Sequence, residues 1–247
     1  MRRAALNALG QPVGEALDGW RPPIDPPGIL LEGRYALLER LAAARHAASL
    51  HRANSADGDG RNWTYLPYGP FDSLAAYRAW IEECSPRRDP LFYAIVERAS
   101  GEALGVASFL RIEPGSGSIE VGHLNFSPRL QRTPAATEAL FLMLGHAFEL
   151  GYRRCEWKCD ALNGASRTAA RRLGFTFEGI FRQATVIKRR NRDTAWYSII
   201  DGEWPALSST LARWLDPENF DADGRQRLAL SEMTQQLPSA GEQRTCS

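Results

Sequence analysis

The sequence has little cysteine, little histidine and no excess of charge of either sign. Thirty basic side chains are balanced by 29 acidic ones, which gives a formal net charge of +1 over 247 residues. A balanced chain has no overall field to attract nucleic acid or a membrane surface, so we expect neither as a partner. The few cysteines and histidines are not clustered at metal-ligand spacings, and we expect no metal site.

Long apolar runs are also absent. The longest apolar helical stretch, 139–150, is too short to cross a bilayer and is interrupted by Gly145, His146 and Glu149. The segment 1–12 begins with positive charge, but polar residues, glycine and proline break it before an apolar run forms, which excludes a secretion signal. We therefore expect a cytoplasmic protein.

The two closest cysteines, Cys155 and Cys159, lie in a segment that we interpret as a strand. An extended strand holds Cα atoms four residues apart at about 13 Å, whereas a disulfide requires less than about 7 Å. We therefore expect all four cysteines to be reduced thiols.

The two ends of the chain differ in composition from its centre. Residues 1–29 hold five prolines and little periodic apolar signal, which indicates an extended arm. Residues 216–247 are polar and form a tail, with one short helix predicted over 228–237. The folded body is predicted over 30–215. A chain of 247 residues can hold one or two domains, and one domain with loose ends is the simplest interpretation.

Within the body, strand-like and helix-like apolar patterns are separated by turn residues. The predicted strands are 35–39, 91–97, 103–112, 118–126, 154–160, 175–186 and 194–200. The predicted helices are 42–53, 73–84 with Asp72 as N-cap, 134–150 and 165–173. This order predicts an α+β fold with a mixed central sheet of about seven strands flanked by helices.

A three-strand meander that leads into a helix through a tight loop resembles the GNAT superfamily of N-acetyltransferases. The segment 119–123, Ile-Glu-Val-Gly-His, is similar to the fourth strand of the branch that acetylates ribosomal-protein N-termini. Asn163 and Ser166, leading into Leu-Gly-Phe at 173–175 and Glu-Gly at 178–179, resemble that branch's second CoA-contacting segment. The resemblance implies a sheet splayed around CoA, transfer of an acyl group from acetyl-CoA, and an amine acceptor, with a homodimer left open.

The loop before the helix 134–150 matches the family's phosphate-binding loop in part. Members hold the CoA pyrophosphate on backbone N–H groups at a helix N-terminus, in the pattern Gln/Arg-x-x-Gly-x-Gly/Ala. Here Gln131 and Ala136 fit the pattern, and Pro134 replaces the central glycine and removes one donor. Proline nevertheless suits the first helical position behind Thr133 as N-cap, and Arg132 can supply what the missing donor gave.

The resemblance assigns a wider set of residues to the cofactor. Asn163 and the loop also suit a plainer interpretation as capped helix starts, which stays open. The residues expected to bind the cofactor are Asn125, Phe126, Gln131, Arg132, Thr133, Ala135, Ala136, Asn163 and Ser166.

Acyl transfer to an amine requires a group that accepts the amine proton. Glu120 is the candidate base, with an ordinary exposed acid or an ion pair to an arginine as the alternative. His123 is the second candidate because an imidazole titrates near neutrality, with a partly buried structural histidine as its alternative.

The family's proton donor to the thiolate, a tyrosine seven residues after Asn163, is replaced here by Ala170. Ser166 is the nearest hydroxyl on the same predicted helix, and solvent is the alternative donor. Backbone N–H groups around Asn125 and Phe126 are the expected oxyanion donors.

Aromatic residues before the second predicted helix mark a candidate acceptor pocket. Trp63, Tyr65 and Tyr68 suit a flat or apolar group, or else they pack a proline-rich loop on the core. The basic segment 188–192 is predicted as a solvated hairpin tip, or it steers an anionic acceptor.

Two other functions compete with acyl transfer to a small amine or peptide N-terminus. A CoA-sensing or partner-binding module that has lost catalysis is suggested by Pro134 and Ala170. A nucleic-acid binder would depend on the few basic residues at 188–192, which the balanced charge of the chain disfavours.

Overall fold

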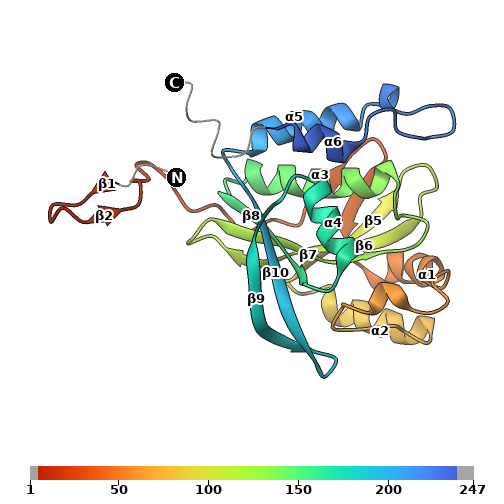
Figure 1. The fold of residues 1–247 in the computed structure, drawn as a ribbon. Helices are drawn as coiled ribbons and strands as arrows, with labels where there is room; N and C mark the ends of the chain where they lie inside the picture. Colours follow the sequence, from red (N-terminus) through yellow and green to blue (C-terminus); the bar gives the residue numbers. More distant parts are fainter. Residues whose placement is uncertain (1–4, 238–247) are drawn as a thin grey trace.

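The computed structural model describes residues 5–237, and eight of its strands form one mixed sheet in the order β3-β4-β5-β6-β7-β8-β10-β9 (Figure 1). Neighbouring strands are antiparallel except β7 and β8, which are parallel. This confirms the mixed sheet, to which β3 adds a short strand that was not predicted. The strands are β3 (Leu31–Glu32), β4 (Ala36–Arg40), β5 (Leu91–Glu97), β6 (Ala103–Glu113), β7 (Ser118–Phe126), β8 (Arg154–Asp160), β9 (Thr176–Ile187) and β10 (Arg190–Ile200).

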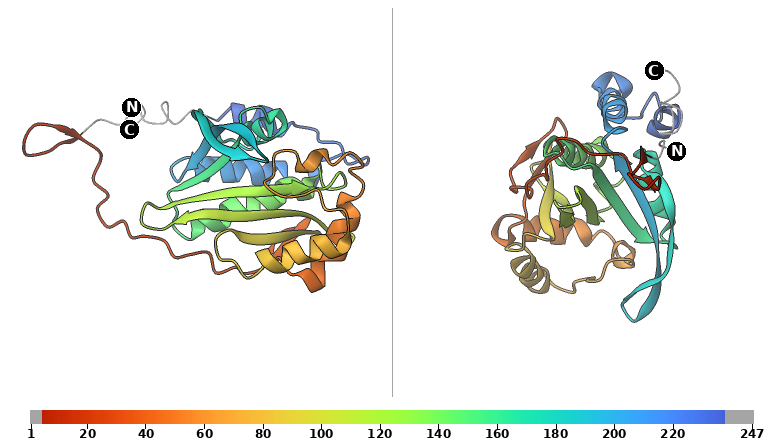
Figure 2. Two further views of the ribbon diagram at one scale, coloured as in Figure 1. Left: turned by 90° about the horizontal axis from the view of Figure 1, so that it is seen from below. Right: turned by 90° about the vertical axis from the view of Figure 1, so that its left-hand side faces the viewer.

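Helices cover both faces of the sheet (Figure 2). On one face lie α1 (Ala43–Asn54) and α2 (Leu74–Cys84), and on the other lie α3 (Pro134–Glu149) and α4 (Gly164–Arg172), with α5 (Trp204–Trp214) and α6 (Leu230–Gln235) outside them. Alternation along β5 divides the core. Phe92, Ala94 and Val96 pack in the cluster under α1 and α2, whereas Leu91, Tyr93 and Ile95 join the larger cluster on the other face.

The ends of the helices correct two details of the sequence analysis. The side chain of Ser73, not of Asp72, caps α2 by accepting the N–H of Ala76 at 3.1 Å. The helix α5 was not predicted, although Leu207, Leu211 and Trp214 bury one face of it at helical spacing.

The C-terminal segment contributes to the core. Helix α6 falls inside the predicted range 228–237, and Leu230 and Met233 are buried in the larger cluster. The folded body therefore extends beyond residue 215, where the polar composition places its end.

A buried carboxylate fixes the start of the sheet. Glu138, on α3, accepts the backbone N–H groups of Arg34, Tyr35 and Ala36 at 2.5 to 2.8 Å. Its side chain fills the space that a Cβ at residue 33 would need, so Gly33 is required there. Helix α3 and strand β4 are joined by this contact across about 100 residues of sequence.

The N-terminal segment runs along the body as an extended arm that ends in a projecting hairpin. The hairpin strands β1 (Ala5–Leu6) and β2 (Pro12–Val13) lie away from the sheet (Figures 1 and 2). Trp20 contacts the guanidinium of Arg153 at 5.7 Å, and the hydroxyl of Tyr152 donates to the carbonyl of Ile24 at 3.2 Å.

Cys84, Cys155 and Cys159 are buried free thiols, and Cys246 lies outside the described residues. Residues 5–237 contain no helix long and apolar enough to span a bilayer. The same residues bring no three histidine, cysteine or acidic side chains together as metal ligands.

Candidate active site

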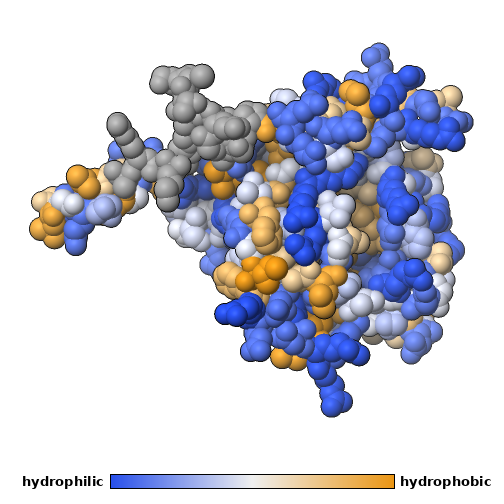
Figure 3. Space-filling view, in the orientation of Figure 1, coloured by the Kyte–Doolittle hydropathy of each residue, from blue (hydrophilic) through white to orange (hydrophobic). Residues whose placement is uncertain are grey.

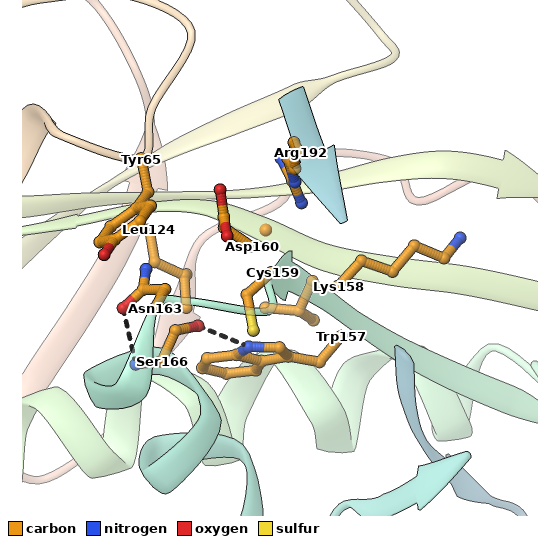
Figure 4. A pocket seen from close by; sticks show the side chains of 11 residues that line it. Tyr65, Leu124, Trp157, Lys158, Cys159, Asp160, Asn163, Ser166 and Arg192 are labelled. Atoms are coloured by element: carbon orange, nitrogen blue, oxygen red, sulfur yellow. Dashed lines mark hydrogen bonds between the residues drawn. The ribbon is translucent and has the colours of Figure 1, made fainter. Parts of the chain in front are cut away.

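The parallel strands β7 and β8 separate partway along their length. They pair only between residues 118–120 and 154–156. Beyond this point a cavity of about 80 Å³ lies between them (Figure 4). Its walls are Val121, Gly122 and Leu124 of β7, Trp157, Lys158, Cys159 and Asp160 of β8, Asn163 and Ser166 at the start of α4, Tyr65, and Arg192 of β10.

A β-bulge shapes the β7 wall of this cavity. His123 and Leu124 together lie opposite the single residue Ala107 of β6, and His123 has a positive φ of 50°. A bulge leaves one residue out of the ladder and bends the strand. The predicted oxyanion donors, Asn125 and Phe126, lie just beyond it and remain paired with β6.

His123 is enclosed by aromatic rings on the side of α2. It stacks on Tyr68 with ring centroids 5.6 Å apart, and its Nδ1 lies 3.2 Å from the Tyr68 hydroxyl. Burial, together with nearby arginines, lowers the pKa of His123 to about 4, so the imidazole is neutral at pH 7. Burial also holds the pKa of Tyr68 well above its ordinary value, so the phenol keeps its proton at pH 7.

Glu120 is not an exposed acid. Its side chain is almost fully buried and forms ion pairs with Arg111 at 2.7 Å and Lys158 at 3.1 Å. Burial raises the pKa of this carboxyl above its ordinary value, against the opposing effect of the two cations. A Cβ at Gly122 would lie 3.4 Å from Oε1 of Glu120, so the carboxylate adjoins the cavity wall.

At the start of α4, both predicted residues line the cavity. The side chain of Asn163 is the N-cap and accepts the N–H of Ser166 at 3.1 Å. The hydroxyl of Ser166 accepts the indole N–H of Trp157 at 2.9 Å (Figure 4), and the same hydroxyl hydrogen-bonds the thiol of Cys159, which favours the thiolate form of that cysteine. Ala170 is fully buried in the core.

In the 131–136 loop, Thr133 caps α3 as the sequence predicts. Its hydroxyl accepts the N–H of Ala136 at 3.2 Å, so this amide is not available to a ligand. Pro134 has no N–H, and the N–H of Ala135 has no partner among the described residues. Arg132 is exposed with a φ of 63°, and Gln131 bonds to the carbonyl of Phe126 at 2.8 Å.

Of the three aromatic residues predicted to line an acceptor pocket, Trp63 does not line the cavity. Trp63 is a core residue, 4% exposed, because it packs edge-on against Tyr68 and neighbouring rings under α2. Tyr65 does line the cavity, and its hydroxyl donates to the carbonyl of Leu162 at 3.3 Å. Tyr68 reaches the site through His123.

Sequence reasoning assigned no role to the cavity residues of β8, and it named Arg192 of β10 only within the basic segment 188–192. Lys158 and Arg192 are placed there by the antiparallel pairing of the two strands, in which Thr194 lies opposite Asp160. Alternation along 154–160 indicates which residues share a face, but the register that brings Arg192 to the cavity is not visible in the sequence.

Comparisons with known proteins bear on the family and the fold. Residues 36–176 match the family model described as an acetyltransferase (GNAT) domain. The crystal structure of a GCN5-related N-acetyltransferase from Brucella melitensis is 45% identical, with a TM-score of 0.86, covering 89% of this chain and all of that one. A probable GNAT-family acetyltransferase from Chromobacterium violaceum is 47% identical, with a TM-score of 0.73, covering 79% of this chain and 98% of that one.

A curated relative is more distant. The ribosomal-protein-serine acetyltransferase of Escherichia coli is 34% identical over 104 residues, which cover 41% of this chain and 58% of that protein. The chain thus spans somewhat more than half the length of this relative.

Proposed function

The chain belongs to the GNAT family of acetyltransferases, and we propose that it transfers the acetyl group of acetyl-CoA directly to the amine of an acceptor bound beside it. The observation that carries this proposal is the cavity between the separating strands β7 and β8. A gap between two parallel strands offers backbone groups from both sides to an extended pantetheine arm. Acetyl-CoA supplies an activated thioester when bound.

Polar groups at the start of α3, at the start of α4 and at the β7 bulge fit the cofactor. The unpaired N–H of Ala135 at the helix start and the exposed guanidinium of Arg132 are the donors for the pyrophosphate. Asn163 and Ser166 face the arm from the start of α4. The bulge at His123 and Leu124 leaves a residue of β7 out of the ladder, and we place the oxyanion donor there rather than at Asn125 or Phe126.

Glu120 is the proposed proton acceptor, acting through water beside Gly122. Its buried carboxyl has a raised pKa, which suits a base better than the depressed pKa of His123. The Nδ1 of His123 is already engaged with the phenol of Tyr68, so we assign this ring to positioning and not to proton acceptance. Ser166 is the proposed donor to the departing thiolate, because its hydroxyl lines the cavity.

The first test is binding and turnover with the intact chain. Acetyl-CoA should raise the melting temperature, as any ligand selective for the native state does, and a panel of amines should release free CoA thiol. Binding without thiol release from any amine would favour a CoA-binding module that has lost catalysis. No thermal shift at millimolar acetyl-CoA would contradict the cofactor assignment itself.

The second test is Glu120→Gln, with Glu156→Gln as a matched control. Both residues pair with Lys158, but Glu120 alone adjoins Gly122. Glu120→Gln should lower kcat/KM about 100-fold at low pH and less at high pH, where the amine is already deprotonated. The control should keep the wild-type pH profile. Identical profiles for the two variants would remove Glu120 as the base.

A further inference from the structure

Arg192 lies at the wall of the cavity and forms no ion pair within residues 5–237. It extends from β10 and is half-buried, on the side of Cys159 away from Ser166 (Figure 4). Its Nε is buried, and in the same residues this atom has no hydrogen-bond partner. The acid that lines the cavity with it, Asp160, accepts the N–H of Leu162 with Oδ1 at 2.8 Å.

The ionised groups beneath the cavity already balance one another. Three carboxylates and three cations form one connected network, so none of these acids is left over for Arg192. The network consists of Glu120, Glu156 and Glu178 with Arg111, Arg154 and Lys158. A guanidinium withdrawn from water without a partner costs free energy, and an anionic ligand would offset that cost.

Positively charged side chains also lie near His123. Arg87, Arg111 and Arg192 act electrostatically on its ring in one direction, and Asp89 acts in the other. Arg87 pairs with Glu83 and Arg111 with Glu120, so Arg192 is the cation of these three that no ion pair within residues 5–237 neutralises. A cationic polyamine would meet like charges here, whereas an anion would be attracted.

We propose that the acceptor is a small amine that also carries a carboxylate or a phosphate, and that Arg192 binds this anionic group. The inference rests on the proposed acetyl transfer and names the class of its acceptor. The planar guanidinium presents paired N–H donors that match two oxygens of either anion. With the anion held by Arg192, the amine is oriented toward the cavity between β7 and β8.

The experiment compares amines that differ only in the anionic group. β-Alanine is paired with β-alaninamide, and 2-aminoethyl phosphate with ethanolamine, each with acetyl-CoA at fixed pH. For each pair, the ratio of the two kcat/KM values is measured in wild type and in Arg192→Gln. The ratio should fall about 10- to 100-fold in the variant, because a charge-assisted contact is lost only by the anionic member. Differences in amine pKa cancel between the two enzymes.

Two control variants separate contact from a general loss of charge. Arg190→Gln removes a cation from the same strand that does not line the cavity, and it should keep the wild-type ratio. Arg192→Lys keeps the positive charge but lacks the paired N–H donors of the guanidinium, and it should give an intermediate ratio. Acetyl-CoA should still raise the melting temperature of all three variants, which shows that they fold.

Distinct results would overturn this inference and the proposed function. An unchanged ratio in Arg192→Gln, or an equal fall in Arg190→Gln, removes Arg192 as the anion contact. Preference of the wild type for the neutral amines contradicts the acceptor class but leaves acetyl transfer intact. Absence of thiol release with every amine contradicts acetyl transfer to small amines, and the inference with it.

Discussion

At the scale of single residues, His123 combines an unusual backbone conformation with a buried imidazole ring. Its positive φ belongs to the bulge that forms the cavity wall, and its ring is enclosed by Tyr68 and Phe92. The sequence predicted a role for this histidine from its type and its place in the resemblance. It did not reveal the bulge, because a register shift depends on the partner strand.

The depressed pKa of His123 predicts a loss of stability in acid. Its native pKa is about 4, against an ordinary value of 6.5, so between these values the unfolded chain binds a proton that the native state does not. The free energy of unfolding therefore falls as pH falls from 6.5 to 4, by about 3 kcal/mol in total. Asn tolerates positive φ, so His123→Asn should fold and show a shallower decline in urea unfolding across this window. An equally steep decline in the variant would contradict this assignment.

At the scale of elements, β10 contributes Arg192 to the cavity, and the loop at the start of α3 follows β7, which forms another part of the wall. Sequence periodicity predicted α3 and β9 to within a residue, since a capped helix start and strong alternation are local signals. It placed the start of β10 at 194 and the hairpin tip over 188–192, whereas β10 begins at Arg190. The contacts between elements were not predictable. Lys188, at the hairpin tip, donates to the carbonyls of Trp63 and Gly69 at 2.8 Å each, although it was expected to be solvated.

The α3 loop predicts a ligand-dependent effect of Arg132→Ala. Because Pro134 and the capped Ala136 contribute no free donor, the arginine should carry much of the phosphate binding. The variant should bind CoA about tenfold or more weakly, while the pantetheine fragment without phosphates binds as before. Calorimetric titration with both ligands decides this. Equal weakening for the two ligands would show that the loop does not hold phosphate.

The hairpin tip predicts a change in acceptor binding for Lys188→Met. Without its ammonium contacts, the tip should separate from the loop that carries Tyr65 and Tyr68. The KM for the acceptor should rise several-fold while CoA affinity stays constant, and hydrogen exchange in 63–69 should become faster. Arg189→Asn, at an exposed neighbouring turn position with positive φ, is the control. Equal exchange in the two variants would contradict a role for Lys188.

At the scale of the whole molecule, the outer strand β9 is largely exposed. Figure 3 shows apolar residues gathered over the hairpin on this face, and the large exposed ones on β9 are Phe177, Ile180, Phe181 and Val186. The family resemblance predicted the arrangement of layers. Composition misjudged the body's C-terminal limit, because the few buried residues of α6 are surrounded by polar ones.

The N-terminal arm joins the body at the closed end of the β7–β8 pair. Trp20 packs by Arg153, where β8 begins, and next to Gly117, just before β7. Trp20→Ala should lower the free energy of unfolding by about 1 to 2 kcal/mol, without a change in CoA affinity. Leu17→Ala, at a 44% exposed position, should have little effect in the same urea titration. Equal losses in both would show that the arm does not act through Trp20.

The reactivity of the buried thiols can report local and global opening of the molecule separately. Cys155 and Cys159, on the same strand, both belong to the larger core cluster, but only Cys159 of these two also lines the cavity. An alkylating reagent should therefore reach Cys159 during local opening between β7 and β8, and Cys155 only on unfolding of the whole sheet. Mass spectrometry over time would give a separate alkylation rate for each of the two cysteines. A bound CoA thioester should lower the rate at Cys159 and leave the rate at Cys155 unchanged.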